Sequence, residues 1–282
     1  MVQQMQGQVA FITGGGRGIG RGIAEAFSAE GASVAVMARS EDQLSETLQQ
    51  IEAVGGRGLM FKGDVTSQDD VDSAVAATET KLGPITTVVS NAGITGPYAP
   101  IAEADPDEWW RTQEVHLRGA FLTSRAAFRS MRSRGGGRII IISSRASERG
   151  TPNISGYAVA KSSQLRFTEM LAAEGAPVGI KAFVLHPGTV DTQFTDEALN
   201  RADANQYASG FVARLKELRK DPAAFTPMSK VTDLCVFLAT GAGDELSGRY
   251  LSVDYDVPSL AKGSTQINER DLYTLRIRTL TD

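Results

Sequence analysis

The feature that most constrains the fold is a run of glycines between an apolar segment and an amphipathic one near the start of the chain. The apolar segment is Val9–Thr13, the run 14–20 reads Gly-Gly-Gly-Arg-Gly-Ile-Gly, and apolar side chains then recur through Ala24, Phe27 and Ala29. We interpret the pattern as a strand, a tight turn and a helix. Glycines let the backbone approach a pyrophosphate, whose charge is met by the free N–H groups at the helix start. A flexible surface loop is the alternative, and the position between strand and helix disfavours it.

Strand-like and helix-like segments alternate along most of the chain. This alternation predicts an α/β fold with a parallel sheet covered by helices on both faces, and 282 residues suit one domain, 1–282. The alternation breaks between 189 and 228, where we expect a lid over a substrate, with a surface insertion as the alternative. The expected strands lie near 8–13, 33–38, 58–62, 86–91, 138–143, 181–187 and 249–254.

A serine, a tyrosine and a lysine stand at spacings that suit proton transfer to a carbonyl oxygen. Tyr157 and Lys161 share one helix face, so the lysine ammonium can favour the ionised phenol. Ser144 lies thirteen positions before Tyr157 and follows the apolar run 138–143, interpreted as a buried strand whose carboxyl end meets ligand. A cap or turn role is the alternative for Ser144, and Ser143 is its rival. The spacing to Tyr157 favours Ser144.

In combination these motifs resemble the short-chain dehydrogenase/reductase family in its form of roughly 250 residues. The resemblance implies a Rossmann-type, doubly wound parallel sheet of about seven strands in the order 3-2-1-4-5-6-7, and an oxidoreductase that acts as a carbonyl reductase or alcohol dehydrogenase. Residues 257–282 form a C-terminal extension outside it. The residues that carry the resemblance are Thr13–Gly20, Asp64, Val65, Asn91, Ala92, Gly93, Ser144, Tyr157–Lys161, Pro187 and Gly188.

The expected cofactor is NADP(H). The second strand ends without the acidic residue that would bond the ribose hydroxyls of NAD and repel a 2′-phosphate. It continues into Arg39 and Ser40 instead, and Arg17 supplies a second cation for a forked phosphate site. A solvated surface charge, neutralised by Glu41 and Asp42, is the alternative for Arg39.

The resemblance also implies the roles of the site residues. Tyr157 exchanges a proton with the substrate oxygen, Ser144 bonds that oxygen, and Lys161 binds the nicotinamide ribose. Asn91 has a structural role that can outweigh its cofactor contact. The implied cofactor-binding residues are Gly14, Gly16, Arg17, Gly18, Ile19, Gly20, Arg39, Ser40, Asp64, Val65, Asn91, Ala92, Gly93, Tyr157, Lys161, Pro187, Gly188, Thr189, Val190 and Thr192.

Two places depart from the family pattern. His116 stands where relatives carry an asparagine that supports a water chain from the lysine, so a proton relay through it is one hypothesis and a buried structural histidine the other. The chain also continues past the last strand, with Leu272, Tyr273, Leu275 and Ile277 in the segment 268–278. That segment is expected to cover a neighbouring subunit or to close a pocket.

Composition excludes several classes of protein. A net charge of −4 gives no basic footprint for nucleic acid, and no apolar run is long enough to span a membrane. The start of the chain does not resemble a secretory signal, so a cytoplasmic setting is expected. Cys235 is expected to pack as a small apolar group, and two histidines with one cysteine make no metal cluster.

Partners and substrate are less constrained. The resemblance implies a homodimer or homotetramer that assembles through the region of Trp109 and Trp110. The alternative is that both tryptophans are core residues, and they would then support no interface. Non-redox chemistry on this scaffold and a non-catalytic NADP(H) sensor are alternatives, both disfavoured by the retained Ser144, Tyr157 and Lys161. The substrate is expected to be a small carbonyl compound or alcohol. The lid residues Phe194, Leu199, Tyr207 and Phe211 suggest a partly apolar pocket. Arg145 and Arg149, near the catalytic serine, suggest room for an acidic group, with solvated surface charges as the alternative.

Overall fold

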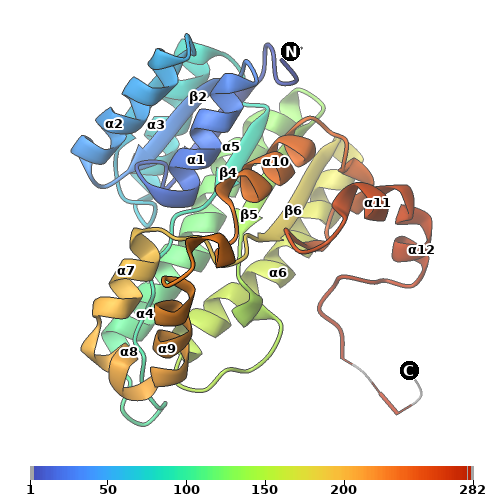
Figure 1. The fold of residues 1–282 in the computed structure, drawn as a ribbon. Coiled ribbons are helices and arrows are strands. Elements are labelled where there is room, and N and C mark those ends of the chain that lie inside the picture. Colours follow the sequence, from blue (N-terminus) through green and yellow to red (C-terminus); the bar gives the residue numbers. More distant parts are fainter. Residues whose placement is uncertain (1–2, 278, 281–282) are drawn as a thin grey trace.

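Seven parallel strands form one sheet in the structure, a computed structural model that describes residues 3–277 and 279–280. The strand order is β3-β2-β1-β4-β5-β6-β7, as predicted, and each strand lies within two residues of its expected position (Figure 1). The strands are β1 (Val9–Thr13), β2 (Ser33–Ala38), β3 (Gly58–Lys62), β4 (Thr87–Ser90), β5 (Gly137–Ile142), β6 (Ile180–His186) and β7 (Tyr250–Ser252).

Helices cover both faces of the sheet, and each face has its own hydrophobic core. Along β1, Ala10 and Ile12 join one core while Val9 and Phe11 join the other, because successive side chains of a strand point to opposite faces. Burial on both faces explains why the strands are continuous apolar runs. One face carries α1 (Gly18–Ala29), α2 (Glu41–Ala53) and α10 (Met228–Ala239), and the other α3 (Gln68–Leu82), α5 (Gly119–Ser133) and α6 (Ser155–Gly175).

The strand order reverses direction between β1 and β4, so the segments that leave these two strands diverge. Such a reversal opens a crevice at the carboxyl ends of the strands, where ligands of open α/β sheets bind. Gly14 follows β1 and Asn91 follows β4. The fold therefore places the glycine run and the segment 91–93 side by side at this crevice.

The expected lid segment is mostly helical. It contains α7 (Gln193–Asn200), α8 (Ala202–Tyr207) and α9 (Ser209–Leu218), which gather beside α4 (Pro106–Gln113) below the sheet (Figure 1). These helices have a small core of their own, made by Tyr98, Ala198, Ala204, Val212 and Leu215. Short helical turns occur at Glu114–Arg118, Arg145–Ser147, Ala176–Val178, Pro222–Ala224 and Asp244–Leu246.

The C-terminal extension packs on its own chain as far as it is described. After α11 (Val257–Lys262) and α12 (Ser264–Glu269), the carbonyl of Tyr273 accepts a 2.8 Å hydrogen bond from the amide of Tyr250 in β7. The amide of Leu275 donates to Glu169 of α6 at 3.2 Å. Residues 278, 281 and 282 of the predicted extension lie outside the described residues. The described segment thus lies along β7 and α6.

The structure shows the surroundings of Cys235 and of the two tryptophans, Trp109 and Trp110. Cys235 is fully buried in the core, as expected of a small apolar group, and burial raises the pKa of its thiol. Trp109 donates from its indole nitrogen to the Ser155 hydroxyl at 3.1 Å. Trp110, by contrast, is 63% exposed. It is therefore not a core residue of this chain.

Candidate active site

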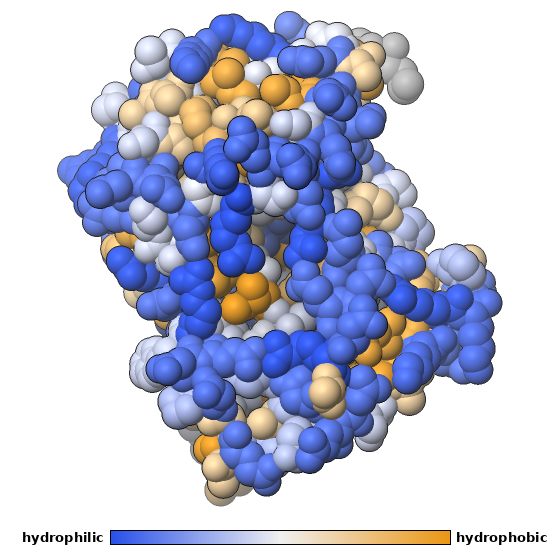
Figure 2. Space-filling model, turned by 90° about the vertical axis from the view of Figure 1, so that its left-hand side faces the viewer, coloured by the Kyte–Doolittle hydropathy of each residue, from blue (hydrophilic) through white to orange (hydrophobic). Residues whose placement is uncertain are grey.

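A cleft of about 890 Å³ runs along the carboxyl ends of the central strands. Figure 2 shows the molecule hollowed here, with apolar side chains at the bottom of the hollow and a hydrophilic rim. All the catalytic and cofactor-binding residues predicted from the sequence line this cleft except Gly20. The fold therefore brings together motifs that are spread from residue 14 to residue 192.

The glycine run is shaped by close contacts of the backbone. Gly14 has a φ of +64°, and a Cβ there would lie 2.9 Å from the Cα of Ala92. Gly20 lies beneath the run, where a Cβ would come within 2.2 Å of the Gly14 carbonyl oxygen. Gly20 thus permits close packing and does not face the cleft. The side-chain amide of Asn91 donates to the carbonyls of Thr13 and Gly14, both at 3.2 Å, which is a structural role.

Asp64 is paired with a residue that the sequence did not single out. Its carboxylate accepts a 2.6 Å bond from Arg111 and further bonds from the amide and hydroxyl of Thr66. Burial alone would raise the pKa of Asp64, but these bonds outweigh it and leave the pKa lowered. Asp64 is therefore ionised, and its pairing with Arg111 fixes the carboxylate beside Val65 at the cleft.

The two arginines expected to bind a phosphate differ in their surroundings. Within the described residues, Arg39 is exposed and has no hydrogen-bond or ion-pair partner. Arg17 forms an ion pair with Glu197 of α7 and thereby links the glycine run to the lid segment. The sequence did not predict this pairing. Arg39 can therefore bind an anion without breaking an ion pair, whereas Arg17 must first release Glu197.

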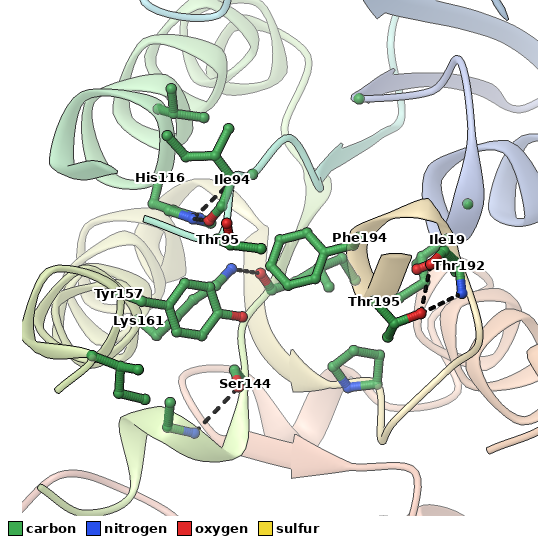
Figure 3. Close-up of a pocket in the computed structure, with 18 of the residues that line it drawn as sticks. Ile19, Ile94, Thr95, His116, Ser144, Tyr157, Lys161, Thr192, Phe194 and Thr195 are labelled. Carbon is green, nitrogen blue, oxygen red and sulfur yellow. Dashed lines mark hydrogen bonds between the residues drawn. The ribbon is translucent and has the colours of Figure 1, made fainter. Parts of the chain in front are cut away.

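Ser144, Tyr157 and Lys161 point into one part of the cleft (Figure 3). Ser144 follows β5 by two residues, and its hydroxyl accepts a 3.2 Å bond from the amide of Ala146, so it also caps the turn Arg145–Ser147. Tyr157 is in the first turns of α6 and lies near that hydroxyl. Burial raises the pKa of Tyr157 to about 12, against a smaller lowering by the Ser144 hydroxyl. The phenol is therefore protonated at neutral pH.

Lys161 lies one helical turn beyond Tyr157 and is only 4% exposed. Its Nζ donates to the carbonyl of Ile142 at 2.8 Å and lies 5.6 Å from the centre of the Tyr157 ring. Burial lowers the pKa of Lys161 to about 7. The lysine is thus close enough to act on the phenol, but burial dominates the tyrosine's pKa. The spacing of Tyr157 and Lys161 alone predicted a lowered pKa for the tyrosine, because the spacing contains no information on burial.

His116 lies in the helical turn Glu114–Arg118, edge-on to Tyr157 with 5.3 Å between ring centres. Its Nε2 lies 2.8 Å from the carbonyl oxygen of Ile94 and 3.2 Å from that residue's amide (Figure 3). The imidazole is buried, and its Nδ1 has no partner among the described residues. Burial, followed by the charge of Lys161, lowers its pKa well below the usual value. His116 is therefore a neutral side chain behind the tyrosine.

The other end of the cleft holds residues that the sequence analysis missed or left undecided. Phe194 and Phe211 line it as expected, whereas Leu199 packs into the lid core. Arg145 is paired with Asp254 at 2.6 Å. The missed lining residues include Thr95, Tyr98, Asn153, Ser209 and Arg214. Their only sequence signal is the i, i+3 spacing of Phe211 and Arg214, which places both on one helix face.

Two kinds of site are absent from the described part of the chain. No three His, Cys, Asp or Glu side chains there are grouped so that they could hold a metal ion. No helix of residues 3–277 combines the length and the apolar character needed to cross a bilayer.

Known proteins are similar to this chain in sequence and in fold. The chain matches the short chain dehydrogenase family model over residues 8–203. It is 34% identical to a short chain dehydrogenase of Pseudocercospora fijiensis, over 97% of this chain and 90% of the relative. A solved putative short-chain alcohol dehydrogenase of Sinorhizobium meliloti is 31% identical with a TM-score of 0.78, covering 90% of this chain and 97% of that one.

A third relative was solved with ligands. This 7α-hydroxysteroid dehydrogenase, in complex with NADH and 7-oxo glycochenodeoxycholic acid, is 26% identical with a TM-score of 0.76, over 88% of this chain and 93% of that one. The two chains therefore share one fold. This chain therefore belongs to the short-chain dehydrogenase family of oxidoreductases, which typically bind a nicotinamide cofactor, NAD(H) or NADP(H).

Proposed function

We propose that this chain transfers a hydride between NADP(H) and a ketone or secondary alcohol, with Tyr157 as general acid and base. The observation that carries the proposal is the convergence of Ser144, Tyr157 and Lys161 in one cleft with the glycine run. Proton transfer by a positioned side chain needs the donor and the substrate oxygen within hydrogen-bond reach. The cleft in front of the Ser144 and Tyr157 hydroxyls supplies a position for the substrate oxygen (Figure 3).

Each side chain has a separate task in this reaction. A nicotinamide bound here would supply a hydride to the carbonyl carbon, or accept one from the carbinol carbon in the reverse direction. Tyr157 is protonated at neutral pH, as a proton donor to a developing alkoxide must be. The Ser144 hydroxyl bonds the same oxygen and stabilises its charge. Lys161, whose pKa of about 7 lies far below that of a free lysine, holds the ribose hydroxyls and returns a proton toward the phenol.

The residues at the nucleotide end fit NADP(H). Gly14, Gly16 and Gly18 line the cleft without side chains that would fill it, so a pyrophosphate can approach the backbone at the start of α1. Arg39 is exposed and unpaired among the described residues, and β2 ends without an acidic side chain. A guanidinium in this place matches a 2′-phosphate. NAD(H) is the second candidate, since one solved relative binds NADH.

Two further expectations depend on the same proposal. The segment 189–228 acts as the substrate lid, supported by Phe194 and Phe211 in the lining of the cleft. A homodimer or homotetramer is supported by large apolar side chains that stand exposed on α4, α5 and α6. These side chains are Trp110, Phe121, Val159 and Met170. Light scattering on the purified chain distinguishes both assemblies from a monomer.

The decisive experiment combines cofactor titration with substitution of the tyrosine. We expect the chain to bind NADPH more tightly than NADH and to oxidise NADPH in the presence of ketones. Tyr157→Phe is expected to lower kcat at least about 10²-fold with NADPH binding retained, because only the phenolic proton is lost. Tyr255→Phe, which changes a tyrosine outside the cleft, is the control. Undiminished turnover by the Tyr157→Phe enzyme would exclude the proposed proton donor.

The choice of nucleotide has its own test. Arg39→Gln is expected to raise the KM for NADPH about tenfold and to leave the KM for NADH unchanged, because only the 2′-phosphate loses a partner. Lys62→Gln removes a nearby cation that does not line the cleft and serves as the control. Equal changes in both KM values would argue against a 2′-phosphate at Arg39.

A further inference from the structure

We infer that the substrate carries a carboxylate or another oxyanion beside an apolar body, and that Arg149 and Arg214 bind this anion. The inference rests on the proposed function and adds the chemical class of its substrate. It is carried by the charges, the placement and the apolar surroundings of these two arginines in the described part of the cleft.

The charges that line the cleft are strongly unbalanced. Asp64 is the only acidic residue among the described lining residues, and Arg111 neutralises it at the nucleotide end. The substrate end is lined by Arg145, Arg149 and Arg214. Arg145 is paired with Asp254, but within residues 3–277 neither of the other two has a hydrogen-bond or ion-pair partner. The described lining at this end therefore carries cations and no acidic side chain.

The fold places both cations close to the reacting groups. Arg149 is in the loop 148–154 that leads from the Ser144 turn to the helix of Tyr157. Arg214 is on α9, and its positive charge, after burial and that of Arg145, contributes to lowering the pKa of His186 to about 4. His186 in turn accepts a 3.2 Å bond from the amide that follows Ser144. Arg214 and Ser144 both line the cleft.

Apolar rings line the same cleft as these cations and the tyrosine. Phe194 packs 6.0 Å from the Tyr157 ring, and Phe211, on the same face of α9 as Arg214, stacks on Tyr98 at 6.3 Å (Figure 3 for Phe194 and Tyr157). Walls of this kind bind an apolar body. Arg149 and Arg214 are exposed, and a guanidinium binds a carboxylate through charge-assisted hydrogen bonds. A compound with a carbonyl at one end and an anion at the other matches both features.

The test compares a keto acid with its neutral ester. We would measure KM and kcat for 3-benzoylpropionate and for its methyl ester, and calorimetric binding of both to the complex of the enzyme with NADP⁺. The acid is expected to have at least a tenfold lower KM and Kd than the ester. The double variant with Arg149→Gln and Arg214→Gln should raise the KM and Kd for the acid about 10-fold to 100-fold and leave those for the ester unchanged.

Lys216→Gln is the matched control, because this cation is on the same helix but does not line the cleft. It should change neither ligand's binding. The inference is overturned if the acid binds no tighter than the ester, or if the arginine substitutions affect acid and ester equally. The calorimetric readout needs no turnover. Failure of the proposed function instead appears as a lack of NADPH oxidation with every ketone, acidic or neutral, and is therefore distinguishable.

Discussion

The nucleotide end of the cleft and the lid end are held by different kinds of interaction. At the nucleotide end, buried or partly buried groups bond the backbone of the glycine run: Arg21 donates to the carbonyl of Gly16 at 2.6 Å and Thr47 to that of Gly15 at 3.0 Å. The lid helices are held mainly by partly exposed ion pairs and a small core. Those pairs are Arg17 with Glu197, Arg201 with Glu108, and Arg219 with Asp191 and Asp196.

This difference separates a rigid half of the site from an adaptable one. Backbone groups that are bonded in the interior keep one geometry, which suits a cofactor that is the same molecule in every turnover. An exposed ion pair contributes only about 0.2–1 kcal/mol, so the lid can be released at little cost. We therefore expect the segment 189–228 to open for the substrate and then to cover it.

The largest difference in stability between the two ends is expected when one methyl group is added to each of them. Gly20→Ala would place a Cβ 2.2 Å from the Gly14 carbonyl oxygen, so we expect a loss of about 3 kcal/mol in the free energy of unfolding. Gly210→Ala on α9 meets open space and is expected to be neutral or to stabilise by about 0.5–1 kcal/mol. Urea unfolding measures both. Equal losses would remove the contrast between the two ends.

Lys161 tests how strongly burial dominates the centre of the cleft. Its pKa in the folded chain, about 7, lies below the unfolded value of 10.5, so the unfolded chain binds more protons between these pH values. The contribution of Lys161 to the stability of the wild type should therefore rise with pH across this window. Lys161→Met lacks this contribution, and its stability relative to wild type should fall by roughly 1–3 kcal/mol from pH 7 to pH 10. Parallel unfolding curves at both pH values would contradict the burial of a charged lysine.

A smaller effect is expected from the ion pairs that attach the lid to α4. Arg201 bonds Glu108 at 2.6 Å and Asp203 at 2.8 Å, and burial limits its contact with water. Arg201→Ala should lower the free energy of unfolding by about 1–2 kcal/mol and speed proteolysis within 193–218. Lys220→Ala, which breaks a well-exposed pair with Glu217, is the control and should have no measurable effect. Unchanged proteolysis of the Arg201→Ala chain would show that the small core alone holds the lid.

The smallest effect is expected at the contact between the two ends. Glu197→Gln removes the carboxylate that occupies Arg17, so NADPH should bind about two- to fivefold more tightly while stability changes by less than about 0.5 kcal/mol. Arg17→Gln removes the cation itself and should weaken NADPH binding. Isothermal titration of both variants provides the comparison. Weaker NADPH binding by the Glu197→Gln chain would mean that the ion pair between Arg17 and Glu197 contributes more to NADPH affinity than an unpaired Arg17 does.

The sequence was sufficient where a signal is local or periodic. The apolar runs located the seven strands, because a strand buried on both faces needs apolar side chains at every position. The glycine run marked the nucleotide end of the site and the spacing of Tyr157 and Lys161 marked its centre, because turns and helix faces follow from neighbouring residues. Nearly every predicted site residue was accordingly found in one cleft.

Contacts between distant segments were decided only by the tertiary structure. Arg17 and Glu197 are 180 positions apart and Asp64 and Arg111 are 47 apart, and no periodicity links either pair. The direction of the Tyr157 pKa also required the folded chain, since burial, which the spacing to Lys161 does not contain, outweighs the lysine. The sequence by itself thus determined the backbone framework and the types of reacting groups. Packing decided their partners, their protonation and the charge at the substrate end, because these depend on which distant residues exclude water from one another.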